Sequence, residues 1–114
     1  MKSFTYQLST SDVKTLLVTL TVMSECLPDL NLEGVSPTRK SQVLLYCDSA
    51  IEKLSNEDDI ASYGELDSIY LSLRLANMIN YGYLFVDDDT SRLCRQYIFG
   101  IQKLLPIFEA YSGN

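Results

Sequence analysis

The apolar and polar positions of this chain repeat with the period of an α-helix over four long stretches. The stretches run from residues 9–11 to about 27, from 37 to about 55, from about 63 to 80, and from about 89 to 111. Apolar residues three and four positions apart form a stripe along each stretch, which is typical of a helix that buries one face. The pattern therefore predicts an all-α fold.

Local signals support where the helices begin. Ser36 and Pro37 are an N-cap residue and a first helical residue, because proline suits the position where a backbone N–H has no partner. Ser62 and Glu65 have the spacing of a capping box, in which each side chain accepts from the other residue's backbone N–H. These signals predict that the second helix begins at 37 and the third close to 63.

The fourth stretch contains both a cap signal and two possible irregularities. Asp89 or Thr90 is the expected N-cap. Gly100 lies within the apolar stripe, where a missing side chain would permit close approach of another helix. Pro106 is expected to kink the last turns, because proline removes a backbone donor.

Two segments alternate with a period of two, as strands do. Residues 16–22 alternate and contain β-branched side chains, but the longer helical spacing from Val13 to Leu27 favours a helix there. Residues 3–8 alternate without a helical pattern, which predicts a short extended arm.

Four helices with short connections predict an antiparallel four-helix bundle, with residues 1–114 as a single domain. In such a bundle the first and third connections lie at the same end. Asp87-Asp88-Asp89 is then expected beside Asp29 and Glu33, and Glu57-Asp58-Asp59 at the opposite end.

The third helix carries apolar residues on more than one face, unlike the other three. Such a helix is either central to the fold or keeps one face for a partner. If a face is kept for a partner, a second copy of the chain could bind through Leu71, Leu75 and Met78.

Composition argues against catalysis and against nucleic-acid binding. The chain has no histidine, and fifteen acidic against nine basic residues give a net charge of −6, which would repel phosphates. No nucleophile motif or glycine-rich phosphate loop is present. Residues 29–34 begin like a calcium-binding loop, but Lys40 stands where the bidentate glutamate belongs. We expect no enzyme, metal or cofactor.

The three cysteines, Cys26, Cys47 and Cys94, fit neither a disulfide framework nor a zinc site. Each falls in an apolar stripe, which predicts small buried side chains in a reducing compartment. Cys94 has the arginine neighbours Arg92 and Arg95, but no histidine is available as a base. With no long apolar run, we expect a cytoplasmic protein that does not enter a membrane.

The remaining hypothesis is a binding protein that neutralises a basic partner, such as an immunity protein or an inhibitor of a nuclease toxin. Carboxylates can occupy a basic surface that otherwise holds phosphate, and tyrosine adds contact area with a polar tip. The alternative is a homodimeric structural or adaptor module without catalytic activity. The residues expected to bind the partner are Glu57, Asp58, Asp59, Tyr63, Tyr81, Tyr83, Asp87, Asp88 and Asp89.

Overall fold

The computed structural model describes residues 7–30, 35–57 and 63–111, and within these ranges every regular element is a helix. The elements are α1 (Thr10–Cys26), the short 3₁₀-helix η1 (Leu27–Asp29), α2 (Pro37–Ser55), α3 (Tyr63–Asn80), α4 (Asp88–Gln96) and α5 (Ile98–Glu109). The predicted all-α class is confirmed. The predicted arm falls mostly outside the described residues; of it, only Gln7 and Leu8 are described.

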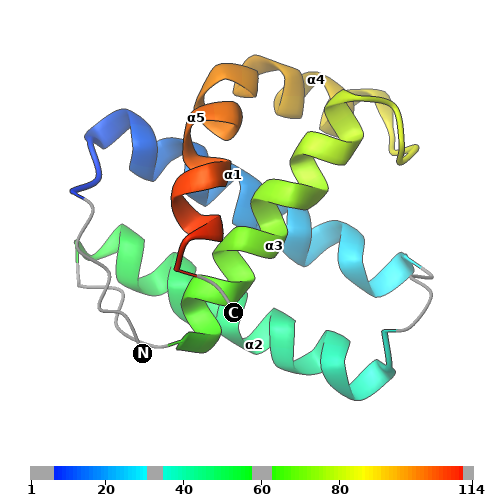
Figure 1. Cartoon of the computed structure of the whole chain (residues 1–114). Helices are drawn as coiled ribbons and strands as arrows, with labels where there is room; N and C mark the ends of the chain where they lie inside the picture. The colour runs from blue at the N-terminus through cyan, green and yellow to red at the C-terminus, as the bar shows by residue number, and fades with distance from the viewer. Residues whose placement is uncertain (1–6, 31–34, 58–62, 112–114) are drawn as a thin grey trace.

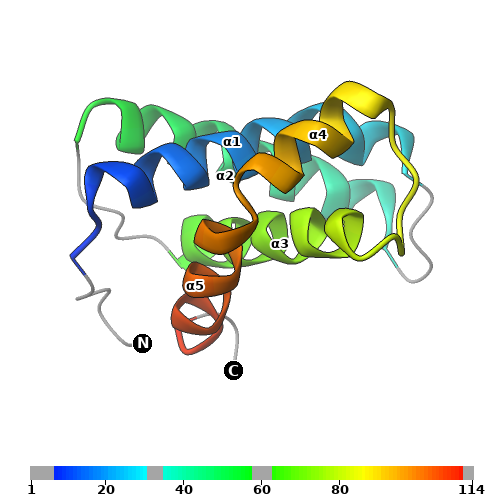
Figure 2. The ribbon, with the colours of Figure 1, turned by 90° about the horizontal axis from the view of Figure 1, so that it is seen from above.

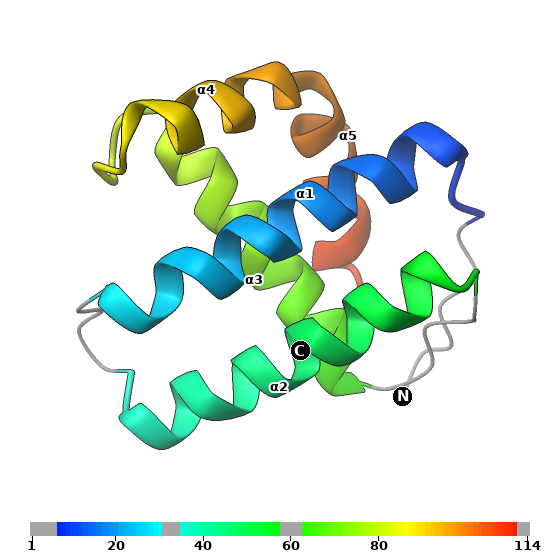
Figure 3. The same cartoon turned by 180° about the vertical axis from the view of Figure 1, so that it is seen from behind.

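Helix α3 lies at the centre of the arrangement. α1 and α2 run side by side, and α3 crosses them on one face of the pair (Figure 3). α3 also packs against α4 and α5, so four helices contact it. A central position explains why the third helix is apolar on more than one face, because each face meets a different neighbour.

The hydrophobic core follows from this arrangement. α1 contributes Leu16 and Leu20, α2 contributes Cys47 and Ala50, and α5 contributes Leu104 and Phe108, all fully buried. The buried apolar side chains of α3 are Leu66, Ile69, Leu73, Leu75, Ala76 and Ile79. Leu75, expected in a homodimer contact, is only 5% exposed, so its side chain offers little surface to a second copy.

The predicted fourth helix is wrong as a single element. α4 ends at Gln96 and α5 begins at Ile98, because Tyr97 leaves the helical region with φ −107° and ψ 18°. The chain turns there, and α5 runs off in a new direction (Figure 1). α5 then packs against α3 and α1. The four-helix bundle is therefore replaced by five helices in the described chain.

The close approach expected at Gly100 is present. The chain changes direction at Tyr97 and not at Pro106, where a kink was expected. A Cβ at Gly100 would lie 2.6 Å from Oγ1 of Thr15 on α1. Helix α5 continues through Pro106 to Glu109. The change of direction occurs at Tyr97 instead, since this is where the chain must leave the path of α4 to reach α3 and α1.

Helix α1 confirms the helical interpretation of residues 16–22. The hydroxyls of its buried threonines form hydrogen bonds within the helix or with α3. These β-branched residues are therefore accommodated in a helix. Oγ1 of Thr19 donates to the carbonyl of Leu16 at 3.1 Å and lies 3.1 Å from Oγ of Ser72. Buried polar side chains that are satisfied in this way join α1 to α3.

The helix starts are confirmed in part. Ser36 caps α2 by accepting from the N–H of Arg39, with Pro37 as the first residue. Ser62, the other half of the expected capping box, lies outside the described residues. The Glu65 carboxylate is buried and accepts from Nζ of Lys53 at 2.8 Å, which joins α3 to α2.

Candidate functional site

Helix α3 ends in a Schellman motif, the arrangement that glycine favours at a helix C-terminus. The N–H of Tyr83 donates to the carbonyl of Met78 at 2.9 Å, and the N–H of Gly82 donates to that of Ile79 at 3.1 Å. Gly82 has φ +78°, a left-handed conformation that other residues adopt at a cost. The predicted end of the third helix at residue 80 is confirmed, and the motif fixes how the chain leaves α3.

In the chain between the two helices, exposed side chains alternate with partly buried ones. Leu84 and Val86 pack against the core, whereas Tyr83 and Phe85 are 76% and 94% exposed. Tyr81, at the end of α3, is 60% exposed. Successive side chains of this connection therefore face the core and the solvent in turn. Three aromatic side chains within five residues are thus left in water.

Asp87 ends this segment and caps α4, which corrects the cap expected at Asp89 or Thr90. Its backbone is extended, and its Oδ1 accepts from the N–H of Thr90 at 2.7 Å. Hydrogen bonding from Thr90 lowers the pKa of the Asp87 carboxyl below its ordinary value of 3.8. The cap lies earlier in the chain than expected because Asp88 and Asp89 already belong to the first turn of α4. Negative charge in that turn interacts favourably with the helix dipole.

The residues Tyr81, Tyr83, Phe85, Asp87, Asp88 and Asp89 are called the connection surface below. It lies at the same end of the molecule as the C-terminal end of α1 (Figure 2). Burial, followed by the negative charges of Asp87, Glu25 and Asp29, raises the pKa of Cys26. Asp29, in η1 directly after α1, therefore lies at the same end of the molecule as Asp87, as expected, while Glu33 lies outside the described residues.

Glu57, the described member of the second predicted acidic cluster, is at the other end of the molecule. Glu57 follows α2, is exposed, and has φ +59°. The C-terminal end of α2 lies far from the connection between α3 and α4 (Figure 1). Asp58, Asp59 and the side chain of Tyr63 lie outside what the structure describes. The predicted site residues therefore do not form one surface.

Three exposed aromatic residues, Tyr46, Phe85 and Phe99, were not among the predicted site residues. Phe85 lies in the apolar run Leu84-Phe85-Val86, and the sequence does not show which of these side chains points outward. Phe99 on α5 is 82% exposed, and its place outside the apolar stripe of that helix is a signal that could have found it. Nε2 of Gln102, one turn beyond Phe99, donates to Oη of Tyr81 at 3.4 Å, so α5 adjoins the connection surface.

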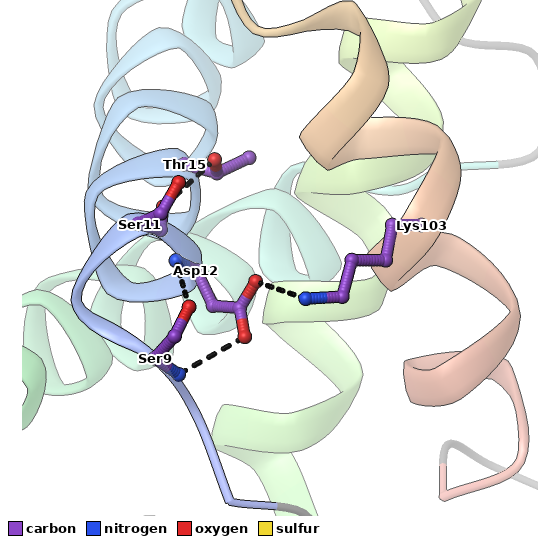
Figure 4. Close-up of polar contacts among 5 residues, drawn as sticks. All are labelled: Ser9, Ser11, Asp12, Thr15 and Lys103. Carbon is purple, nitrogen blue, oxygen red and sulfur yellow. Dashed lines mark hydrogen bonds and ion pairs between the residues drawn. The ribbon is translucent and has the colours of Figure 1, made fainter.

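A buried polar cluster joins α1 to α5, and it is the other place to look for chemistry. Asp12 on α1 and Lys103 on α5 point toward each other (Figure 4), with Oδ1 and Nζ 2.9 Å apart. Oδ2 of Asp12 accepts from the N–H of Ser9 at 3.0 Å, and Ser9 caps α1. Thr15 donates to the carbonyl of Ser11. Both carboxylate oxygens of Asp12 therefore have hydrogen-bond partners that join the start of α1 to α5.

The pKa of Asp12 reflects this environment. Burial alone would raise it, but the N–H of Ser9 and the ammonium of Lys103 outweigh burial and hold the pKa below 3.8. The residues around Asp12 and Lys103, with Thr15 and Gly100, are called the α1–α5 junction below. Its carboxylate is ionised at neutral pH and stabilises the fold.

The thiols are protonated under ordinary conditions. Burial raises the pKa of Cys47 to about 12 and that of Cys94 to about 11. The arginines next to Cys94 in sequence therefore do not activate it. Within the described ranges no three His, Cys, Asp or Glu side chains are grouped as metal ligands, and no helix is long and apolar enough to cross a membrane.

Comparison with known proteins adds no candidate for the role of these residues. No family model matches the chain, and neither a curated protein nor a solved structure is similar enough to count as a match. The exposed chemistry of the connection surface is therefore the basis on which a function can be inferred.

Proposed function

We propose that this chain is a small acidic binding protein that neutralises a basic protein partner, in the manner of an immunity protein or an inhibitor of a nuclease toxin. The observation that carries the proposal is the connection surface. There, exposed aromatic side chains lie beside three consecutive aspartates, all anchored between two helices. This is a binding role without catalysis, exercised in the cytoplasm.

The two kinds of side chain on this surface have different tasks. Tyr83 and Phe85 offer apolar area, and burying such side chains drives association. Asp88 and Asp89 attract a basic surface and speed the encounter, in line with the net charge of −6. A nuclease holds its phosphate backbone with cationic side chains, so carboxylates placed there compete with the substrate.

Recovery of the partner tests this function. The tagged protein is purified from its native host at low and at high salt, and proteins that accompany it are identified by mass spectrometry. We expect a basic protein that is partly lost as salt rises, because exposed charge pairs are screened. Recovery of only a second copy of the chain, or of a partner without a basic surface, would contradict the proposal.

Matched variants then locate the contact. In Asp88→Ser with Asp89→Ser, we expect slower association with the recovered partner and a weaker salt dependence. Glu57→Ser is the control, because it removes an exposed carboxylate from the opposite end of the molecule. If only Glu57→Ser changes the association rate, the contact with the partner lies at the C-terminal end of α2 instead.

A further inference from the structure

We propose that the segment received by the connection surface is rich in arginine, and that this surface prefers arginine to lysine. The inference rests on the proposed function and names the chemistry of the same surface. Guanidinium groups stack on Tyr83 and Phe85, and a neighbouring aspartate accepts their N–H groups. The partner is thus defined by planar cations and not by positive charge alone.

The backbone that carries the aromatic side chains is held in place before any partner arrives. The Schellman motif at Gly82 fixes one end of the segment, and the Asp87 cap fixes the other. Between them, Leu84 and Val86 pack against the core. Because the backbone is anchored at these points, binding does not have to order the segment, which lowers the entropic cost of association.

The three aspartates are not equally available. Asp87 is engaged as the cap of α4, and Asp89 lies 3.7 Å from Arg92 in an exposed ion pair. For Asp88, neither an ion pair nor a side-chain hydrogen bond is found within the described chain. Its exposed carboxylate is close in sequence to Phe85, so Asp88 is the acceptor best placed for an incoming cation.

The combination of aromatic faces and a carboxylate selects arginine. Guanidinium is planar and weakly hydrated, so it stacks on an aromatic ring while its N–H fork still meets a carboxylate. Lysine presents a compact, strongly hydrated ammonium that gains less from the ring. A wholly apolar segment would bury the aspartates without a partner, which is costly. Charge complementarity therefore excludes an apolar occupant.

Two peptides of equal length and charge test the preference, one of alternating arginine and glycine and one of alternating lysine and glycine. Their affinities for the full chain are measured by isothermal titration calorimetry at low salt. We expect the arginine peptide to bind about fivefold more tightly, since exposed cation–π contacts are modest individually. Equal affinities, or no binding of either peptide, would overturn the inference.

Variants attribute the preference to this surface. Tyr83→Ser with Phe85→Ser should bring the two peptides to nearly equal affinity, whereas Leu45→Ser, a change at an exposed apolar residue on α2, should leave the preference intact. A preference that survives the double substitution overturns the inference. If a recovered basic partner binds the double variant as tightly as it binds the original chain, the inference is also overturned. The proposed function would still stand in that case.

Discussion

The α1–α5 junction and the connection surface place their side chains in opposite ways, because the first buries a charged side chain and the second exposes apolar ones. At the junction, the charged Asp12 is almost fully buried, and both of its oxygens are bonded. At the connection surface, the apolar Phe85 is 94% exposed, and inward-facing neighbours hold its backbone in place.

The difference shows where each region contributes. A buried carboxylate persists only if its bonds offset the cost of removing it from water, so the junction contributes to stability. An exposed phenylalanine gives up burial that would stabilise the monomer, so the connection surface contributes to association. The comparison predicts that substitutions at the junction lower the free energy of unfolding, whereas substitutions at the surface change binding alone.

Gly100→Ala should have the largest effect on stability. The new Cβ would lie 2.6 Å from Oγ1 and 3.0 Å from Cγ2 of Thr15, so α5 would have to move away from α1. We expect the free energy of unfolding to fall by about 2 kcal/mol, despite the better helix propensity of alanine. Urea denaturation measures the change.

A second substitution controls for causes other than the contact. Thr15→Ala removes the atoms that alanine at 100 would meet, so the double variant should regain part of the lost stability. Strictly additive losses in Thr15→Ala and Gly100→Ala would contradict the close contact of these helices.

Asp12→Asn should have a smaller effect, and one that depends on pH. Because the folded-state pKa of Asp12 lies below 3.8, its ionised form stabilises the fold above that pH, and this contribution is lost as pH falls through the folded pKa. At neutral pH we expect a loss of about 1 kcal/mol. The two proteins should converge as the pH falls through the lowered folded-state pKa of Asp12, as measured by thermal unfolding across pH. A constant difference across this range would show that the charge of Asp12 is not what stabilises the junction.

Tyr83→Ser with Phe85→Ser should have the smallest effect on stability. Both side chains are largely in water, so we expect the free energy of unfolding to change by no more than about 0.5 kcal/mol. Urea denaturation checks this, with Leu84→Ser as the inward-facing comparison in the same segment. If the double variant is destabilised as much as Leu84→Ser, the two aromatic residues are packing residues and the distinction between the regions fails.

Much of the fold could be predicted because its helices begin and end with local signals. Ser36 and Pro37 start α2 as the sequence indicates, and Gly82 ends α3. The break at Tyr97 has no such signal, since neither glycine nor proline stands there. It arises from the packing of α5 on α3 and α1, which a local pattern does not contain.

The candidate site could be predicted only in part, for a related reason. Tyr81 and Tyr83 were selected because tyrosine combines contact area with a polar tip, and both are exposed. Phe85 was missed because an apolar run does not show which of its members face water. Which of them does depends on the path that the chain takes after the left-handed turn at Gly82.

The alternation of the segment between Gly82 and Asp87 makes its length a determinant of what the protein displays. Inserting one residue after Gly82 would exchange the two sets of side chains, turning Leu84 and Val86 outward and Phe85 toward the core. Identical residues would then present an aliphatic surface in place of an aromatic one. The number of residues in this connection thus encodes specificity as directly as their identities do.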